Sequence, residues 1–205
     1  MPGDMVWLPP PARGTPVCLG MDGSDSDDWT ALRAETRDGY QFTPRFGPDR
    51  APTIWIPAQH GGRVPRLEVD AALAEVMGAY PVSRMYMDPP MWRTEGETWI
   101  SAYGEETVFF WETSRVTPMH SALVRFSTDL STGRIRQDGC PLTSLSMQNA
   151  RKSPRPGERY ILKKPSETQK IDPSMASVLA HEAACDARAS GWGQETRSTV
   201  ICFTR

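Results

Sequence analysis

The first clear hydrophobic pattern in the chain is a short apolar run at residues 17–21, which stops at Asp22. The acidic sequence GSDSDD follows, which is typical of a turn, and residues 29–34 then resume with side chains that favour a strand. This order predicts a β-hairpin with carboxylates at its tip. A third strand is expected at residues 53–57, after a loop rich in glycine and proline.

Helical periodicity begins further along the chain. Residues 67–80 carry apolar side chains at intervals of four, three and four positions, which predicts an amphipathic helix that ends before Pro81. The later elements are expected as strands at 82–87, 107–111, 159–163 and 199–203, and as helices at 94–103, 119–130, 144–151 and from Asp172 onwards. Alternating strands and helices favour parallel crossovers. The predicted fold class is α/β, with a mixed sheet opened by a hairpin and flanked by helices.

Size and composition fit a single globular domain. The chain has 205 residues, of which 39% are hydrophobic and 23% charged, and its net charge is -2. No apolar stretch approaches the roughly 18 residues of a membrane span, and the N-terminus lacks a secretory apolar segment. The proline-rich residues 1–15 are expected to be a linker remnant, and residues 16–205 to form the domain.

Several common chemistries find no support in the sequence. The cysteines form no CxxC pair and no nearby histidine completes a zinc pattern, so Cys18 and Cys185 are expected to be core residues. The three histidines are scattered, which argues against a nucleophilic triad, and His181 is expected to lie on the surface or in packing. There is no GxxxxGK[ST] phosphate loop.

Three aspartates stand at the boundaries of predicted elements. Asp22 ends the first strand, Asp88 follows a later strand, and Asp172 precedes Pro173 at the start of the last helix, where it is expected to be the N-cap. Sites in open α/β sheets collect at the carboxyl ends of strands. Carboxylates meeting there could hold two divalent cations about 4 Å apart, which is an arrangement that cleaves phosphodiesters. Taken alone, Asp172 is more typical of a helix cap, and Asp88 is as typical of a turn as of a ligand. Asp22 is the best single candidate, because it interrupts a strand.

The surrounding charges add a second indication. Asp28 opens the second predicted strand, close to Asp22 across the hairpin, and could assist a metal site, whereas Asp25 and Asp27 are expected to be solvated turn residues. The turn lacks the glycine and closing glutamate of an EF-hand. Residues 151–170 contain seven basic side chains against two acidic ones, a net +5, in a chain of net -2. This stretch suits either a phosphate backbone or an ordinary solvated loop.

At these residues the sequence resembles the C-terminal nuclease domain of phage large terminase subunits, the DNA-packaging enzymes of tailed viruses. Three segments carry the resemblance in the same order, and together they span residues 16 to about 190. They are VCLGMDGSDSDDWTAL around Asp22, MYMDPPMWRTEGETWISAYG around Asp88, and KKPSETQKIDPSMASVLAHEAACDA around Asp172.

The resemblance implies an RNase H-like fold and metal-dependent cleavage of double-stranded DNA with two Mg²⁺ or Mn²⁺ ions. It places metal ligands at Asp22, Asp88 and Asp172, with Asp28 as an auxiliary carboxylate. The expected DNA-binding residues are Asn149, Arg151, Lys152, Lys163 and Lys164. Where many relatives carry a histidine, this chain has Met147 and Gln148, which puts a role for that region in doubt.

The resemblance also implies partners: a terminase ATPase domain in the same full-length chain, the portal and the small terminase subunit, with action in the host cell cytoplasm and no membrane. We expect the sequence to be an excised domain, although a standalone nuclease is the other interpretation. Two further hypotheses stay open. One is another RNase H-like nuclease or resolvase, and the other is a catalytically silent module that docks DNA or a portal.

Overall fold

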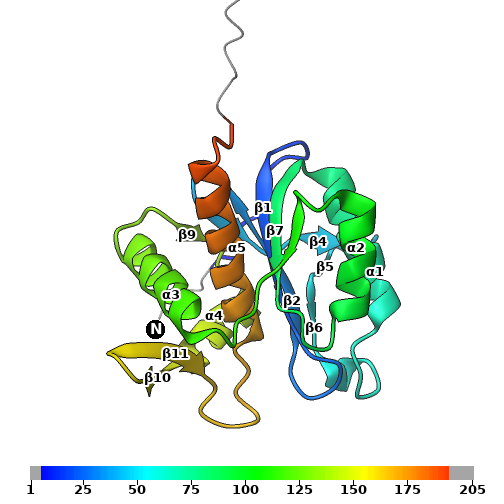
Figure 1. Cartoon of the computed structure of the whole chain (residues 1–205). Coiled ribbons are helices and arrows are strands. Elements are labelled where there is room, and N and C mark those ends of the chain that lie inside the picture. Colours follow the sequence, from blue (N-terminus) through cyan, green and yellow to red (C-terminus); the bar gives the residue numbers. More distant parts are fainter. Residues whose placement is uncertain (1–5, 194–205) are drawn as a thin grey trace, which may run out of the picture.

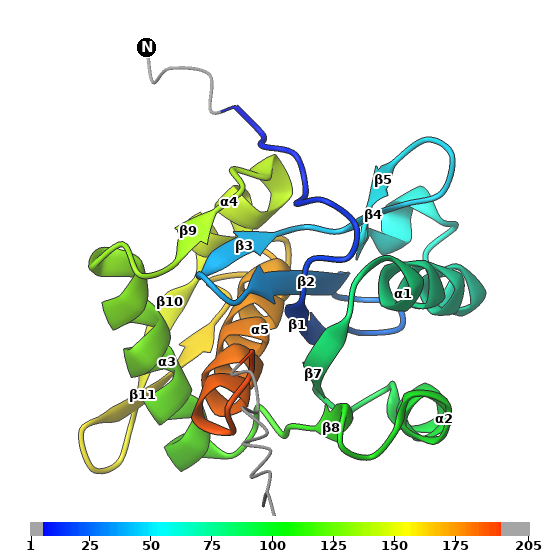
Figure 2. The ribbon, with the colours of Figure 1, turned by 90° about the horizontal axis from the view of Figure 1, so that it is seen from above.

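The computed structural model describes residues 6–193 and has a central sheet between two layers of helices (Figures 1 and 2). The predicted α/β class, with a mixed sheet opened by a hairpin, is confirmed. The strands are β1 Val17–Asp22, β2 Thr30–Thr36, β3 Tyr40–Phe42, β4 Arg45–Phe46, β5 Ala51–Pro52, β6 Ile54–Trp55, β7 Val82–Met87, β8 Val108–Phe110, β9 Arg136–Gln137, β10 Arg151–Arg155 and β11 Arg159–Lys163. The helices are η1 Pro57–Gln59, α1 Arg66–Ala79, α2 Arg93–Tyr103, α3 Val116–Ser131, α4 Pro141–Asn149 and α5 Asp172–Ala189.

The central sheet has the strand order β8-β7-β1-β2-β3-β9, and β6 pairs with β2 off this path. The strands β1 and β2 form the predicted antiparallel hairpin, which pairs Val17 with Thr36 at one end and Asp22 with Ala31 at the other. The strands β7 and β8 run parallel to β1, as the alternation of helices and strands predicted. The short strands β3 and β9 lie at the other end of the sheet and were not predicted.

The alternation of side chains along β1 assigns each of them to one face of the sheet. Val17, Leu19 and Met21 are buried in a cluster with residues of α1 and α2. Cys18 belongs to a different cluster, with Tyr86 and the alanines of α5. The side chain of Asp22, two positions beyond Gly20, therefore lies on the α5 face of the sheet.

The helix α5 packs directly against the middle of the sheet. Every residue from Asp172 to Ala184 is buried. Gly20 allows the close approach, because a Cβ there would lie 2.2 Å from the backbone oxygen of Ala176 and 2.2 Å from the backbone nitrogen of Ala180. The alanines of α5 also allow this close approach, because their side chains are small.

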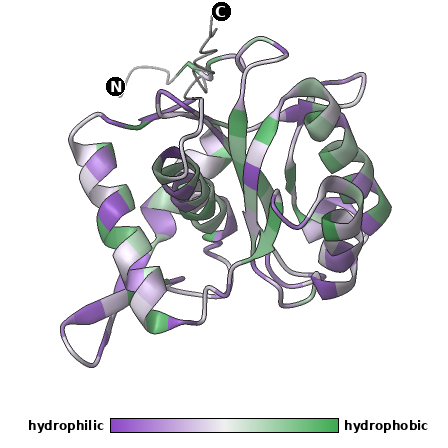
Figure 3. Cartoon of the chain, turned by 45° about the horizontal axis from the view of Figure 1, so that its top comes forward, coloured by the Kyte–Doolittle hydropathy of each residue, from purple (hydrophilic) through white to green (hydrophobic). Residues whose placement is uncertain are grey.

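The basic stretch folds as a second, two-stranded sheet formed by β10 and β11. Figure 3 shows this hairpin in hydrophilic colours, at the edge of the molecule beside α3. The helix expected at 144–151 instead ends at Asn149, and Arg151 begins β10. The reason is that Ala150 is extended and Arg151 pairs with Lys163, a long-range contact that helical propensity does not register.

The segment before β1 lies against the domain. The backbone N–H of Leu8 donates to the Asp138 carbonyl at 2.7 Å, and the Tyr80 hydroxyl donates to the Pro11 carbonyl at 3.2 Å. The division of the chain at residue 15 stays a prediction. The strand expected at 199–203 falls outside the described residues. Within residues 6–193, no helix has the length and apolar character needed to cross a bilayer.

Candidate functional site

Asp22 and Asp88 lie at neighbouring strand ends because of the register between β1 and β7. The parallel pairing matches Met21 with Met87, and each aspartate is the next residue along its strand. The backbone N–H of Asp88 also donates to the Met21 carbonyl at 3.2 Å. The carboxyl ends of two central strands thus bring both aspartates to one edge of the sheet.

Asp172 comes to the same edge from α5. It is the first residue of the helix rather than the predicted N-cap, which is Ile171, and the helix has no side-chain cap. The difference has a structural reason: the Asp172 carboxylate turns towards the β1–β2 loop, where Oδ2 accepts a hydrogen bond of 3.2 Å from the Trp29 backbone N–H. This hydrogen bond connects the start of α5 to the β1–β2 hairpin.

A pocket of about 330 Å³ opens at this edge of the sheet. Asp22, Asp28 and Asp172 line it together with Lys163 and Lys164. Asp88 borders an adjacent depression, and Thr113, which lines the main pocket, binds both of its oxygens. The Thr113 hydroxyl donates at 2.6 Å and the Thr113 backbone N–H at 3.1 Å.

The carboxylates disfavour one another's ionisation. Burial, followed by the negative charges of Asp172, Asp88 and Asp28, raises the pKa of Asp22 well above its usual range. Burial and the charge of Asp28 raise the pKa of Asp172 to about 7. Burial raises the pKa of Asp88 against the opposing hydrogen bonds from Thr113. Such mutual repulsion in a pocket is what a bound cation would relieve.

Asp28 has a different environment from the other three aspartates. Its Oδ1 accepts from Lys164 Nζ at 2.7 Å and from Lys170 Nζ at 2.7 Å. Burial alone would raise the pKa of Asp28, but the hydrogen bonds and charges of these two lysines lower it. The negative charge of Asp28 is therefore already neutralised, and its predicted role as an auxiliary ligand stays a prediction.

The predicted DNA-binding residues lie at and beyond the rim of the pocket. Arg151 and Lys163 are exposed and sit directly opposite each other in the β10–β11 hairpin. Lys152 is also exposed, and its ammonium lies 4.5 Å from the centre of the Tyr160 ring. Asn149 is buried and donates to the Lys170 carbonyl at 3.0 Å, so it positions the lysine-bearing loop. A contact between Asn149 and DNA stays a prediction.

Two residues of the site were not foreseen from the sequence. Thr113 follows β8 and orients Asp88, and Lys170 pairs with Asp28. The sequence does place Thr113 just beyond a predicted strand next to the strand of Asp88, which is a usable signal. Nothing in the local sequence around Lys170 distinguishes it from the other basic residues of the stretch.

Solved structures with a similar fold include phage large terminases and their nucleases. The HK97 bacteriophage large terminase matches with a TM-score of 0.63 and 19% identity, over 86% of this chain and 41% of that one. The large terminase nuclease of thermophilic phage G20c, solved with bound magnesium, matches with a TM-score of 0.62 and 13% identity, over 87% and 92% of the two chains. The chain therefore shares its fold with these phage large terminase structures, as the resemblance in its motifs implied.

The similar proteins of known sequence are two mycobacteriophage proteins. The Gene 13 protein of Mycobacterium phage D29 is 30% identical over 193 residues, which are 87% of this chain and 31% of that protein. The Gene 13 protein of Mycobacterium phage L5 is 28% identical over 206 residues, which are 94% of this chain and 33% of that protein. The chain thus spans about a third of the length of these relatives. No protein-family model matches it.

Proposed function

We propose that this chain is a metal-dependent endonuclease that cleaves double-stranded DNA. The observation that carries the proposal is the convergence of Asp22, Asp88 and Asp172 from two adjacent strand ends and one helix start. Burial raises the pKa of all three carboxyls, and the charges of neighbouring aspartates raise the pKa of Asp22 and of Asp172 further. This donor set suits Mg²⁺ or Mn²⁺, which prefer oxygen ligands and leave positions open for water and phosphate.

The two-ion part of the proposal rests on the resemblance to phage terminase nucleases and on carboxylates that reach one edge of the sheet from different elements. When bound, such ions would activate a water molecule and stabilise the leaving oxygen of a phosphodiester.

The protein's own residues would orient these groups and hold the substrate. Thr113 holds both oxygens of Asp88, and the Trp29 N–H holds Asp172. Lys163 and Lys164 line the pocket beside the carboxylates and would bind the phosphate backbone, with Arg151 and Lys152 extending the basic surface along the hairpin. Contacts to phosphates carry no sequence information, so cleavage with little sequence preference is expected.

Plasmid nicking in the presence of Mn²⁺ tests the proposal. Asp22→Asn and Asp88→Asn each remove one negative charge from the site while keeping the side-chain shape. We expect each to reduce nicking by about 100-fold or more, because metal-held charge stabilisation supplies several kcal/mol. The matched control is Asp27→Asn, which makes the same change at an exposed position of the same loop and should nick like the parent chain.

The outcomes separate the competing functions. Full activity in Asp22→Asn and Asp88→Asn would contradict the metal-site assignment. Preferential cleavage of four-way junctions or RNA–DNA hybrids over duplex DNA would instead indicate another RNase H-like nuclease or a resolvase. A parent chain that binds no Mg²⁺ or Mn²⁺ in calorimetry would indicate a silent module that docks DNA or a portal.

The biological setting that we propose is genome packaging in a phage-infected host cytoplasm. The support is the fold shared with large terminase nucleases and the likeness to a third of two longer phage proteins. In that setting, a terminase ATPase domain, the portal and the small terminase subunit would be the partners. Cleavage by this domain would then begin and end packaging.

A further inference from the structure

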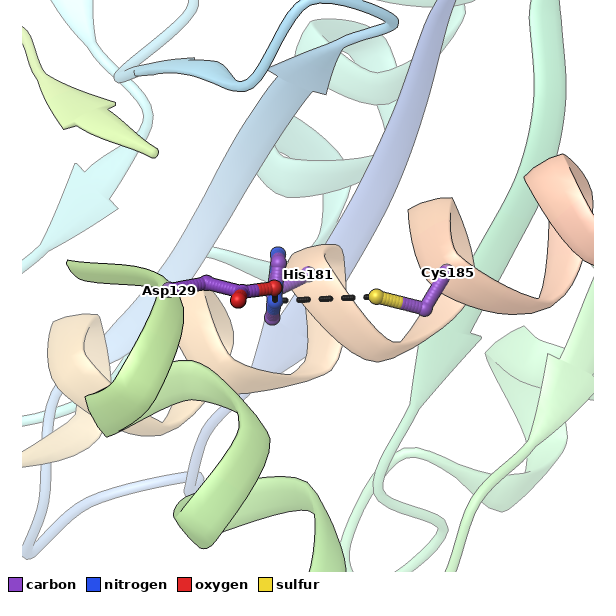
Figure 4. Close-up of side chains that lie close together, drawn as sticks. All are labelled: Asp129, His181 and Cys185. Atoms are coloured by element: carbon purple, nitrogen blue, oxygen red, sulfur yellow. Dashed lines mark hydrogen bonds and ion pairs between the residues drawn. The ribbon is translucent and has the colours of Figure 1, made fainter. Parts of the chain in front are cut away.

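A second cluster of metal-ligating side chains lies away from the aspartate pocket, between α3 and α5. It consists of Asp129 near the end of α3 and of His181 and Cys185, one turn apart on α5 (Figure 4). One ligand atom from each lies within 4.8 Å of the other two, and in the described part of the chain this is the only such group. His181 is nine residues after Asp172, so the cluster is about 14 Å further along the helix axis.

We propose that Asp129, His181 and Cys185 form a binding site for a transition-metal ion of the zinc class. A histidine and a cysteine four residues apart on one helix face can hold the same ion, and a carboxylate completes a three-ligand protein set. Nitrogen, sulfur and oxygen donors together suit Zn²⁺ and do not suit Mg²⁺. The site is thus chemically distinct from the aspartate pocket.

The distances between the ligand atoms match a tetrahedral zinc site. His181 Nε2 lies 3.6 Å from Cys185 Sγ and 3.2 Å from Asp129 Oδ2. Zinc bond lengths at tetrahedral angles place a nitrogen about 3.6 Å from a sulfur ligand and about 3.3 Å from an oxygen ligand. His181 Nε2 therefore already lies at tetrahedral separations from both other ligand atoms, which lie within 4.8 Å of each other.

The surroundings of His181 resemble those of metal-bound histidines. His181 Nδ1 lies 2.9 Å from Oε2 of the fully buried Glu35, so Nδ1–H can donate to that carboxylate while Nε2 faces Asp129 and Cys185. Carboxylates hold zinc-bound imidazoles in this way. The Phe126 ring packs edge-on against the imidazole, with the ring centres 5.8 Å apart. The histidine is therefore held in one orientation before any metal arrives.

An open position and a path for entry are both present. Asp129, His181 and Cys185 line a pocket of about 350 Å³, which leaves room for a water molecule as a fourth ligand. Arg134 binds Oδ1 of Asp129 at 3.0 Å and leaves Oδ2 facing the histidine. Arg188 Nη1 lies 3.7 Å from Cys185 Sγ. On binding, the Cys185 thiol and the imidazole Nε2 would each release a proton to solvent.

Bound metal would join α3 to α5. The helix α3 also packs against β11, which belongs to the basic hairpin. A metal clip between α3 and α5 would therefore hold the hairpin in place relative to the helix that carries Asp172. This consequence rests on the proposed function of the hairpin, whereas the existence of the metal site does not.

Cobalt absorption spectroscopy on the 205-residue chain tests the site directly. Co²⁺ titrated into the reduced, metal-free chain should give a thiolate-to-cobalt charge-transfer band and the intense visible bands of tetrahedral cobalt. Zn²⁺ should remove both bands by competition. Cobalt held only by the aspartates would give neither, because that pocket offers oxygen ligands. Absence of the thiolate band in the parent chain would overturn the proposal, and the cluster would then be a charged hydrogen-bond network only.

Matched variants identify the residues that give rise to the thiolate band. Cys185→Ser should abolish the thiolate band, and Asp129→Asn should weaken zinc binding at least tenfold. Glu35→Gln should weaken it about 10- to 100-fold while leaving the shape of the band unchanged, since Glu35 acts through the histidine. Asp22→Asn, Cys140→Ser and Cys202→Ser should retain the band. A band that survives Cys185→Ser, or that disappears in Cys202→Ser, would overturn the assignment.

A thermal measurement keeps the test independent of nuclease activity. Zinc at a hundredfold excess over its Kd should raise the Tm of the parent chain by about 5 °C or more, because it binds only the folded state. The Cys185→Ser chain should show no comparable rise, and its metal-free Tm reports whether the substitution itself disturbs folding. Equal rises in both chains would contradict the site. Failure of the nuclease proposal would leave these results unchanged.

Discussion

At the scale of single residues, Gly20 has the most demanding position in the fold. It lies in the central strand β1, on the face that α5 covers, and no atom larger than hydrogen fits at its side-chain position. Its two neighbours in the α5 backbone cannot give way without moving the helix that carries Asp172. Gly20 therefore determines the distance between the strand of Asp22 and the helix of Asp172.

Gly20→Ala should destabilise the fold strongly. The added Cβ would lie 2.2 Å from backbone atoms of Ala176 and Ala180, so relief requires a shift of α5 rather than of a side chain. We expect the free energy of unfolding to fall by about 3 kcal/mol or more. Gly78→Ala is the control, because Gly78 lies in α1 with open space around it and alanine favours helix. Urea denaturation measures both, and an unchanged midpoint in Gly20→Ala would contradict the close packing.

At the scale of elements, the sequence predicted those strands and helices whose apolar side chains follow a regular local period. The strands around 17–21 and 82–87 and the helix at 67–80 follow from apolar spacing, and so does the placement of Asp22 and Asp88 at strand ends. The short strands β3 and β9 pair across the chain and have too few residues to show a period. Pairing with Lys163 likewise places Arg151 in a strand, although the local sequence predicted the end of a helix there.

In the candidate sites too, the sequence predicts the local features and misses the contacts between residues that are distant in the chain. Asp172 could be placed at a helix start, but its hydrogen bond to Trp29 joins residues 143 positions apart, which capping rules do not foresee. Cys185 was expected in the core, yet it is only partly buried and lines a pocket with His181. Its third neighbour, Asp129, comes from another helix. Because the cluster is assembled from two helices, the sequence shows the spacing of His181 and Cys185 but not that Asp129 lies beside them.

The β10–β11 hairpin has a charge pattern that opposes its own stability. Two of its cross-strand pairs join like charges, Arg151 with Lys163 and Arg155 with Arg159. Like charges directly opposite in an antiparallel pair destabilise it. Strand alternation places all four residues on one face of the hairpin. A surface that concentrates positive charge at a cost in stability is suited to a polyanion.

The double variant Arg151→Ala/Lys163→Ala should therefore weaken DNA binding without weakening the fold. We expect an affinity for duplex DNA lower by about tenfold and a salt dependence shallower by about two phosphate contacts. The Tm should stay the same or rise slightly, because a like-charge pair is removed. Arg50→Ala, an exposed arginine in the β4–β5 loop away from the hairpin, is the control. Fluorescence anisotropy at several salt concentrations measures the effect, and equal losses in both variants would contradict a role for the hairpin.

At the scale of the whole molecule, one buried ion pair connects parts that are distant in the chain. Arg33 of β2 is fully buried, and its Nη1 lies 3.2 Å from Oδ1 of Asp138, which follows β9. Arg33 Nε donates to the Ser177 hydroxyl of α5 at 3.1 Å. Asp138 also accepts hydrogen bonds from Trp7 in the N-terminal segment and from the Thr43 backbone. The segment before β1, the sheet and α5 therefore meet in one polar network.

The charge of Asp138 makes this network sensitive to acid. Burial alone would raise the pKa of Asp138, but the charge of Arg33 and the hydrogen bonds from Thr43, Cys140 and Trp7 hold that pKa below its ordinary value. Because the pKa of Asp138 is lower in the folded protein than in the unfolded chain, its charge stabilises the fold fully at pH values above the unfolded pKa of about 4. The stabilisation is then lost as the pH falls through the folded value, when protonation leaves Arg33 buried beside a neutral partner.

Asp138→Asn should abolish this part of the acid sensitivity. At pH 7 the variant should be less stable than the parent chain by about 3–5 kcal/mol, because Arg33 keeps its charge without a compensating carboxylate. The deficit should shrink as the pH falls below about 4, since the parent chain then loses the same charge by protonation. Asp49→Asn is the control, because Asp49 is an exposed residue of the β4–β5 loop. Urea denaturation from pH 7 down to pH 3 measures both variants. A deficit independent of pH would mean that shape and hydrogen bonding at residue 138, rather than its charge, hold these parts of the molecule together.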